Sequence, residues 1–245
     1  MPRASRWPAY LDALQSISGL ILALFMWLHM GFVSSILISE KAFWTIARMF
    51  EGYFILGRAL PQLVSGFVLL IWLLLVLHAL LAMRKFPDSW RQYRTIWRHQ
   101  RSFKHADTGL WLLQVVTGFL MFFLAPVHLY AMFAEPELID PYGSADLVWS
   151  GFSWPLLALL LLCVELHGLV GLYRLALKWG WPRFGDATRS RKILKRLLWL
   201  LIVLFIGVGC VTLSTFMRIG YHHAAHAGEL YQPLDELPAT AEESH

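Results

Sequence analysis

Residues 19–37 read GLILALFMWLHMGFVSSIL, an apolar run that contains a single ionisable side chain, His29. Such a run is long enough to cross a membrane, because about 20 apolar residues span the hydrocarbon core of a bilayer. Three other apolar runs each hold one histidine as well: His78, His128 and His167. A histidine in hydrocarbon is costly, so it is by default a functional hypothesis. This repeated pattern decides both the fold and the function that we expect.

The composition is that of a polytopic membrane protein. Of 245 residues, 58% are hydrophobic and 15% are charged, which excludes an ordinary soluble domain. The net charge of +5 comes from basic residues beside the apolar runs, so it indicates membrane topology and not nucleic-acid binding. Cys163 and Cys210 lie inside apolar runs and form no metal or disulfide motif, so we expect no iron–sulfur cluster on this chain. The first run is too long for a signal peptide and is expected to be retained.

The apolar runs predict an all-α integral membrane protein with a five-transmembrane-helix bundle. The four histidines inside these runs could hold two b haems, because imidazole is the commonest protein ligand of haem iron, and the bundle would then enclose both. The second and fourth runs begin beside Pro61 and Pro155, and proline is tolerated in a first helical turn. The transmembrane domain is expected over residues 1–218, with a polar periplasmic tail over 219–245. The expected spans are about 16–38, 60–83, 108–133, 153–177 and 193–217.

Charges in the connections predict the orientation of the bundle. Residues 84–104 and residues 178–196 each carry seven Lys or Arg against one Asp. The connection between the third and fourth spans has no basic residue and four acidic ones: Glu135, Glu137, Asp140 and Asp146. Because cytoplasmic loops hold the excess of Lys and Arg, the N-terminus is predicted to be cytoplasmic and the C-terminus periplasmic.

Orientation converts the position of each histidine into a depth. At 1.5 Å per residue, His78 and His167 lie roughly 9 and 15 Å from the inner end of their spans, and His29 and His128 roughly 20 and 30 Å. An inner pair and an outer pair result, and two imidazoles make a closed, electron-transferring haem site. A lone transmembrane histidine is often only a hydrogen-bonded bundle residue. Four of them, one per span and in two layers, favour ligation of two haems.

Four stretches carry a resemblance to a known family. They resemble the dihaem cytochrome b membrane subunit of epsilonproteobacterial quinol:fumarate reductases, in the complex II family, over about residues 8–218. The spacing of all four histidines is preserved. The stretches are GLILALFMWLHMGFVSSIL (19–37), HALLAMRKFPDSWRQYRT (78–95), HADTGLWLLQVVTGFLMFFLAPVHLY (105–130) and ELHGLVGLYRLALKWGW (165–181).

The resemblance implies a membrane anchor in the bacterial cytoplasmic (inner) membrane. Such a subunit oxidises menaquinol near the outer side and passes electrons through two b haems. The electrons reach an iron–sulfur subunit and an FAD-containing flavoprotein subunit on the cytoplasmic side, where fumarate is reduced. A dimer of these heterotrimers is a possible assembly. In the family, His29 and His128 would ligate the distal haem, and His78 and His167 the proximal one.

Two acids are candidates for proton transfer. Glu51 precedes the second span on the outer side and resembles the quinol-site carboxylate of the family; a quinol releases two protons as it gives up two electrons, so its site needs a base. The alternative for Glu51 is a solvated surface acid. Glu165 lies inside the fourth span, where a carboxyl tends to stay neutral. The resemblance favours transmembrane proton transfer by Glu165, and a structural hydrogen bond is the alternative.

Four further residues match haem-propionate contacts of the family: Gln15, Ser16, Trp111 and Lys178. All of them lie near the inner layer, and their alternative role is ordinary interfacial anchoring. The basic loop at 84–104 is expected to orient the chain and to face the iron–sulfur subunit. We expect His99 and His105 to be exposed there. No role is assigned to the tail histidines, His222, His223 and His226.

Three other functions compete with this interpretation. The same scaffold supports succinate oxidation by quinone, the reverse direction. A cytochrome b subunit of a hydrogenase or formate dehydrogenase also holds haems, although the Arg-Lys-Phe-Pro and Glu-Leu-His-Gly contexts fit it poorly. A haem-free transporter or proton channel could use the histidines and acids as a relay. A reduced-minus-oxidised spectrum separates the haem proteins from the last of these.

Overall fold

The computed structural model describes residues 5–85, 89, 91–92, 94–95 and 106–233, and all regular structure in this part of the chain is helical. Five of the helices are long and apolar enough to cross a membrane. Each one contains the greater part of one predicted span. The five are α1 (Trp7–Ser34), α4 (Pro61–Met83), α6 (Ala106–Ala134), α8 (Trp154–Trp179) and α9 (Ala187–His223).

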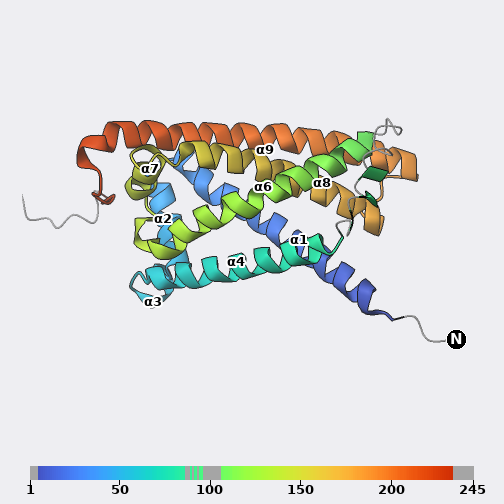
Figure 1. The fold of residues 1–245 in the computed structure, drawn as a ribbon. Helices are drawn as coiled ribbons and strands as arrows, with labels where there is room; N and C mark the ends of the chain where they lie inside the picture. The colour runs from blue at the N-terminus through green and yellow to red at the C-terminus, as the bar shows by residue number, and fades with distance from the viewer. Residues whose placement is uncertain (1–4, 86–88, 90, 93, 96–105, 234–245) are drawn as a thin grey trace, which may run out of the picture.

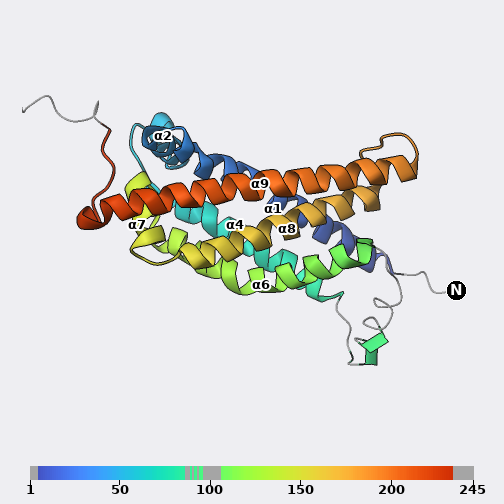
Figure 2. The same ribbon diagram turned by 90° about the horizontal axis from the view of Figure 1, so that it is seen from above.

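The long helices run side by side as an elongated bundle (Figure 1). Contacts join α1 to α4, α4 to α6, α6 to α8 and α8 to α9, and the view from above shows the same neighbours (Figure 2). The helix α1 begins at one end of the bundle and α9 ends at the other. The end of the bundle where α1 begins also holds the starts of α6 and α9 and the ends of α4 and α8. The charges of the connections predict that this end, which we call the inner end, faces the cytoplasm.

Short helices gather at the opposite end, which we call the outer end (Figure 1). They are α2 (Glu40–Phe50), α3 (Tyr53–Leu56) and α7 (Pro141–Trp149), with the 3₁₀ turns η1 (Ser35–Leu37), η2 (Pro136–Leu138) and η3 (Ala224–His226). Two of these helices have side-chain N-caps: Ser39 accepts a hydrogen bond from Ala42 N–H at 3.0 Å, and Asp140 accepts one from Gly143 N–H at 2.7 Å. Such caps satisfy backbone donors that a helix start leaves free.

An apolar cluster fastens the outer helices to the bundle. Phe43 of α2 is 2% exposed and packs with Ala145 and Val148 of α7 and with Phe216 of α9. Burial of these side chains stabilises the outer end by roughly 25 cal/mol per Å² of apolar surface. The sequence interpretation treated these segments as connections. They are ordered helices that hold Glu51 and the acidic third connection in place.

Helix bounds differ from the predicted spans at both ends of the chain. The helix α1 begins at Trp7 instead of near residue 16, with Pro8 in its first turn. The helix α9 begins at Ala187, after the N-cap Asp186, and continues to His223. The expected domain boundary at residue 218 therefore falls inside a helix. Beyond it, Gly228 N–H and Tyr231 N–H donate hydrogen bonds back to Asp146 and Asp140.

Candidate functional site

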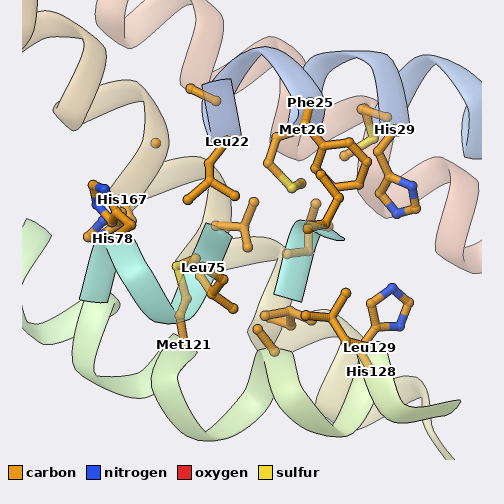
Figure 3. Close-up of a pocket in the computed structure, with 18 of the residues that line it drawn as sticks. Leu22, Phe25, Met26, His29, Leu75, His78, Met121, His128, Leu129 and His167 are labelled. Carbon is orange, nitrogen blue, oxygen red and sulfur yellow. The ribbon is translucent and has the colours of Figure 1, made fainter. Parts of the chain in front are cut away.

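One cavity of about 1250 Å³ runs between the helices and is lined by all four transmembrane histidines. Figure 3 shows His78 and His167 together at one end of it and His29 and His128 together at the other. Apolar side chains lie between the two pairs, among them Leu22, Met26, Leu75 and Met121. The structure thus brings the histidines together in the pairs that the depth argument predicts.

The distance between the two imidazole rings of each pair fits a metal ion bound between them. The ring centroids of His29 and His128 are 6.0 Å apart, and those of His78 and His167 are 6.5 Å apart. Metal–imidazole bonds are about 2 Å long and a centroid lies roughly 1 Å behind its nitrogen, so two rings on one metal place their centroids about 6 Å apart. No group of three or more His, Cys, Asp or Glu suitable for a metal occurs among the described residues. Pairs of imidazoles suit haem iron, because the macrocycle supplies the other ligands.

Hydrogen bonds fix the tautomer of both inner histidines. His167 Nδ1 lies 2.8 Å from the backbone carbonyl of Gln114 and donates to it. His78 Nδ1 lies 3.1 Å from Ser18 Oγ, and that hydroxyl donates its own proton to Gln15 C=O. Ser18 Oγ therefore accepts from His78 Nδ1–H. In both rings Nε2 is left as a lone pair, the arrangement in which a second hydrogen bond orients a metal ligand.

Each inner ring lies against a glycine on the neighbouring helix. A Cβ on Gly19 of α1 would lie 2.8 Å from Cε1 of His78, and a Cβ on Gly118 of α6 would lie 2.7 Å from Cε1 of His167. Contacts this short do not occur with real side chains, so any larger residue would displace the ring. The two glycines therefore set how closely α4 and α8 can bring their histidines to α1 and α6.

The outer pair has different neighbours. Phe25 stacks on His29 with centroids 5.7 Å apart, and Phe32 meets the same ring edge-on at 6.5 Å. Within the described ranges, neither His29 nor His128 makes a hydrogen bond through its ring. The outer rings are thus placed by aromatic packing and helix geometry.

The predicted propionate residues meet at the inner end of the cavity, the end that holds His78 and His167. Gln15, Ser16, Trp111 and Lys178 all line it. Lys178 Nζ donates to Ser16 Oγ at 2.9 Å, and Gln15 Oε1 is a buried oxygen without a hydrogen-bond partner. A buried polar atom without a hydrogen-bond partner is rare in native proteins.

Two charged residues at this end, Asp12 and Arg174, were missed by the sequence interpretation. Asp12 forms ion pairs with both Lys85 and Lys178, and Arg174 donates to the side-chain oxygen of Gln114. Lys85, which was expected to orient the chain, also lines the cavity. Asp12 is on α1, Lys85 follows α4 and Lys178 ends α8, so only the folded bundle brings these charges together.

Glu51 lines the outer end of the cavity and is not a solvated surface acid. Its side chain is 1% exposed, and Arg48 in the last turn of α2 donates to Oε2 at 2.5 Å. The other oxygen, Oε1, is buried without a partner. Burial raises the pKa of Glu51, an effect that Arg48 opposes and that the charge of Asp140 reinforces. The result is a carboxyl that has a free lone pair and takes up a proton more readily than an exposed acid.

Glu165 has a different place. It is 3% exposed on α8, and its Oε1 is a buried oxygen without a partner. Glu165 is not among the residues that line the cavity. It precedes His167 by two positions, or roughly 200° around a helix of 3.6 residues per turn, so the two side chains point to different sides of α8.

The histidines of the loops and the tail lie outside the described residues or near the outer end. His99 and His105 and most of the basic loop at 84–104 lie outside the described residues. His223 Nδ1 lies 3.0 Å from Asp146 Oδ1, and His226 Nδ1 lies 3.4 Å from Glu229 Oε1. His222 lines a small outer pocket of about 400 Å³. None of these tail histidines lines the main cavity.

Comparison with known proteins agrees with this architecture. Residues 90–208 match the family model described as succinate dehydrogenase/fumarate reductase transmembrane subunit. Fumarate reductase cytochrome b subunits from two strains of Helicobacter pylori are each 48% identical over 212 residues, which is 86% of this chain and 82% of theirs. The fumarate reductase cytochrome b subunit of Wolinella succinogenes is 44% identical over 218 residues, 89% of this chain and 85% of its own. The chain therefore belongs to the fumarate reductase cytochrome b family of membrane subunits.

Proposed function

We propose that this chain is the quinol-oxidising anchor of a fumarate reductase and that it holds two b haems, one between His29 and His128 and one between His78 and His167. This proposal rests on one observation: two pairs of imidazole rings line a single cavity, and the ring centroids within each pair are 6.0 and 6.5 Å apart. Two haems bound there would supply one-electron carriers at two depths of the membrane. FAD and iron–sulfur clusters belong to partner subunits.

The cytoplasmic end of the cavity suits the anionic edge of a haem. Lys178, Lys85 and Arg174 line it, and Ser16 and Trp111 add a hydroxyl and an indole N–H. We assign Gln15, Ser16, Trp111 and Lys178 to the propionates of the inner haem. Asp12 holds the two lysines in position, because a carboxylate between two ammonium groups reduces their mutual repulsion.

Glu51 is the proton acceptor of quinol oxidation in this proposal. A quinol that gives up two electrons releases two hydroxyl protons, and Glu51, which lines the cavity, has a buried oxygen, Oε1, without a hydrogen-bond partner. Menaquinol would lie between Glu51 and the His29 ring, among the phenylalanines that include Phe50 and Phe67. The paired oxygen, Oε2, keeps the carboxyl oriented through Arg48.

Glu165 is assigned a role in proton movement across the membrane. Quinol oxidation on the outer side with fumarate reduction on the inner side would move negative charge inward. A proton that follows through the protein cancels that charge movement, and a buried carboxyl with an unpartnered oxygen is suited to carry it.

The proposed setting is the bacterial cytoplasmic membrane, with the basic connections facing the cytoplasm. There the chain would contact an iron–sulfur subunit and, through it, a flavoprotein subunit. The outer helices and the C-terminal tail would face the periplasm.

The test is purification of the chain with its partner subunits, followed by a menaquinol:fumarate assay. The proposal expects fumarate reduction driven by a menaquinol analogue and reduction of b-type haem by the same donor. A chain that shows no haem absorption, or whose complex reduces fumarate only from artificial donors, would overturn it.

A further inference from the structure

Gln114 of α6 makes two hydrogen bonds to the neighbouring helix α8. Its backbone carbonyl accepts from His167 Nδ1–H at 2.8 Å, and its side-chain oxygen, Oε1, accepts from an N–H of Arg174. Helices α6 and α8 lie side by side along the bundle (Figure 2). One residue of α6 therefore holds both a candidate haem ligand and a cation of α8.

Gly171 makes room on α8 for the Gln114 side chain. A Cβ on Gly171 would lie 2.9 Å from Nε2 of Gln114, which is too close for a real side chain. The amide of Gln114 therefore lies against α8 at a position between His167 and Arg174. Arg174 follows His167 by seven positions, or nearly two full turns, so it lies on the same face of α8 and roughly 10 Å nearer the inner end. All four residues line the cavity.

Arg174 is a cation without an acidic partner. The other two cations that line the inner end of the cavity, Lys85 and Lys178, both form ion pairs with Asp12. Within the described ranges, Arg174 forms no ion pair. Three cations against one carboxylate leave an excess of two positive charges. An unpaired cation beside apolar surface is costly, and the two propionates of a haem would balance this excess.

We propose that Arg174, held in place by Gln114, sets the midpoint potential of the inner haem. This inference rests on the proposed binding of a haem between His78 and His167. A fixed positive charge favours the redox state that carries one more electron, so Arg174 raises the potential of the inner haem. A higher potential makes the inner site the better acceptor for electrons that arrive from the outer one.

The test is a redox titration of the complete complex with Arg174→Gln, followed through the haem absorbance. At about 10 Å and an effective dielectric constant of about 20, a unit charge changes the equilibrium constant for reduction by roughly tenfold. That change corresponds to about 59 mV for one electron. The midpoint potential of the inner haem, which is the spectral component lost in His167→Ala, is expected to fall by about this amount. The potential of the outer haem in the same sample is expected to stay in place.

Two further variants separate the charge of Arg174 from its structural role. Arg174→Lys keeps the charge, so it should retain most of the potential of the unaltered complex. Gln114→Met removes the Oε1 acceptor but keeps the backbone carbonyl that binds His167, so a smaller fall is expected. The matched control is Arg183→Gln. Arg183 lies beyond the end of α8, donates to the Gly180 carbonyl and does not line the cavity, so its replacement should leave both potentials unchanged.

An unchanged inner potential in Arg174→Gln overturns the proposal, and so does an equal fall in Arg174→Lys and Arg174→Gln. If Arg174→Gln binds no inner haem, Gln114→Met decides, and an unchanged potential in that variant overturns the proposal. Absence of haem from the unaltered complex rejects the proposed function instead. That outcome differs from a bound haem whose potential does not respond to Arg174.

Discussion

The two ends of the cavity position their histidines by different means. At the inner end, His78 and His167 each hydrogen-bond through Nδ1 and each lie against a glycine. At the outer end, His29 has aromatic neighbours and no ring hydrogen bond within the described residues. The inner end also carries lysines around Asp12, whereas the outer end carries the ion pair between Arg48 and Glu51.

This difference separates two tasks. In the proposed function, the inner end would hold ligands and anionic groups in fixed positions, since hydrogen bonds and close backbone contact restrict the rings. The outer end would supply the proton acceptor of quinol oxidation. Four substitutions test whether the two ends have these separate roles.

Glu51→Gln has the largest expected effect. Glutamine keeps the shape of the side chain but cannot accept a proton from quinol, so menaquinol oxidation should fall to background. Both haem spectra should remain, because Glu51 is not a ligand. The control on the same helix is Glu40→Gln. Normal menaquinol turnover in Glu51→Gln would contradict the assignment of the outer end.

Gly118→Ala tests the inner end. The added methyl would lie 2.7 Å from the His167 ring, so the ring must move and the inner haem should be lost or strongly perturbed. Alanine in a helix interior otherwise stabilises by about 0.5–1 kcal/mol relative to glycine. The controls Gly31→Ala and Gly66→Ala meet nothing within 4 Å and should keep full haem content. Equal haem content in all three would show that the close contact has no role.

Glu165→Gln is expected to slow menaquinol:fumarate activity without loss of haem, because it removes a proton carrier inside the membrane. Fumarate reduction from an artificial donor that supplies the partner subunits directly should be unchanged. If both activities are unchanged, Glu165 is a structural residue. If both fall equally, the variant has damaged assembly instead of proton movement.

Ser18→Ala has the smallest expected effect. It removes the hydrogen bond to His78, worth about 1 kcal/mol, and an imidazole without its acceptor is a weaker ligand base. The midpoint potential of the inner haem should rise by tens of mV, which redox titration can resolve. The control Ser34→Ala lies on the same helix and bonds Thr212. A potential unchanged by either substitution would remove Ser18 from the ligand shell.

Much of the architecture could be predicted from the sequence. The apolar runs predict the membrane spans because length and hydropathy are local properties of the sequence. The charges of the connections predict the order in depth of His29, His78, His128 and His167. The short outer helices were missed because their apolar face, which includes the buried Phe43 and Ala145, is interrupted by polar residues. The expected tail boundary at residue 218 lies within α9, because that helix continues past the apolar run to His223.

Residues that act across the fold could not be predicted in the same way. Ser18 and His78 are 60 positions apart, and Lys178 and Asp12 are 166 apart. Nothing near Gly118 in the sequence shows that its missing side chain makes room for His167. Asp140 was noted only as part of an acidic loop, because its distant partner Tyr231 is brought to it by tertiary packing.

Haem counting on the purified complex is the decisive measurement. We predict two b haems per chain, one of which disappears in His78→Ala or His167→Ala and the other in His29→Ala or His128→Ala. Variants within one layer should therefore lose the same spectral component. A single haem in the unaltered chain, or loss of different components from His78→Ala and His167→Ala, would contradict the pairing on which the account rests.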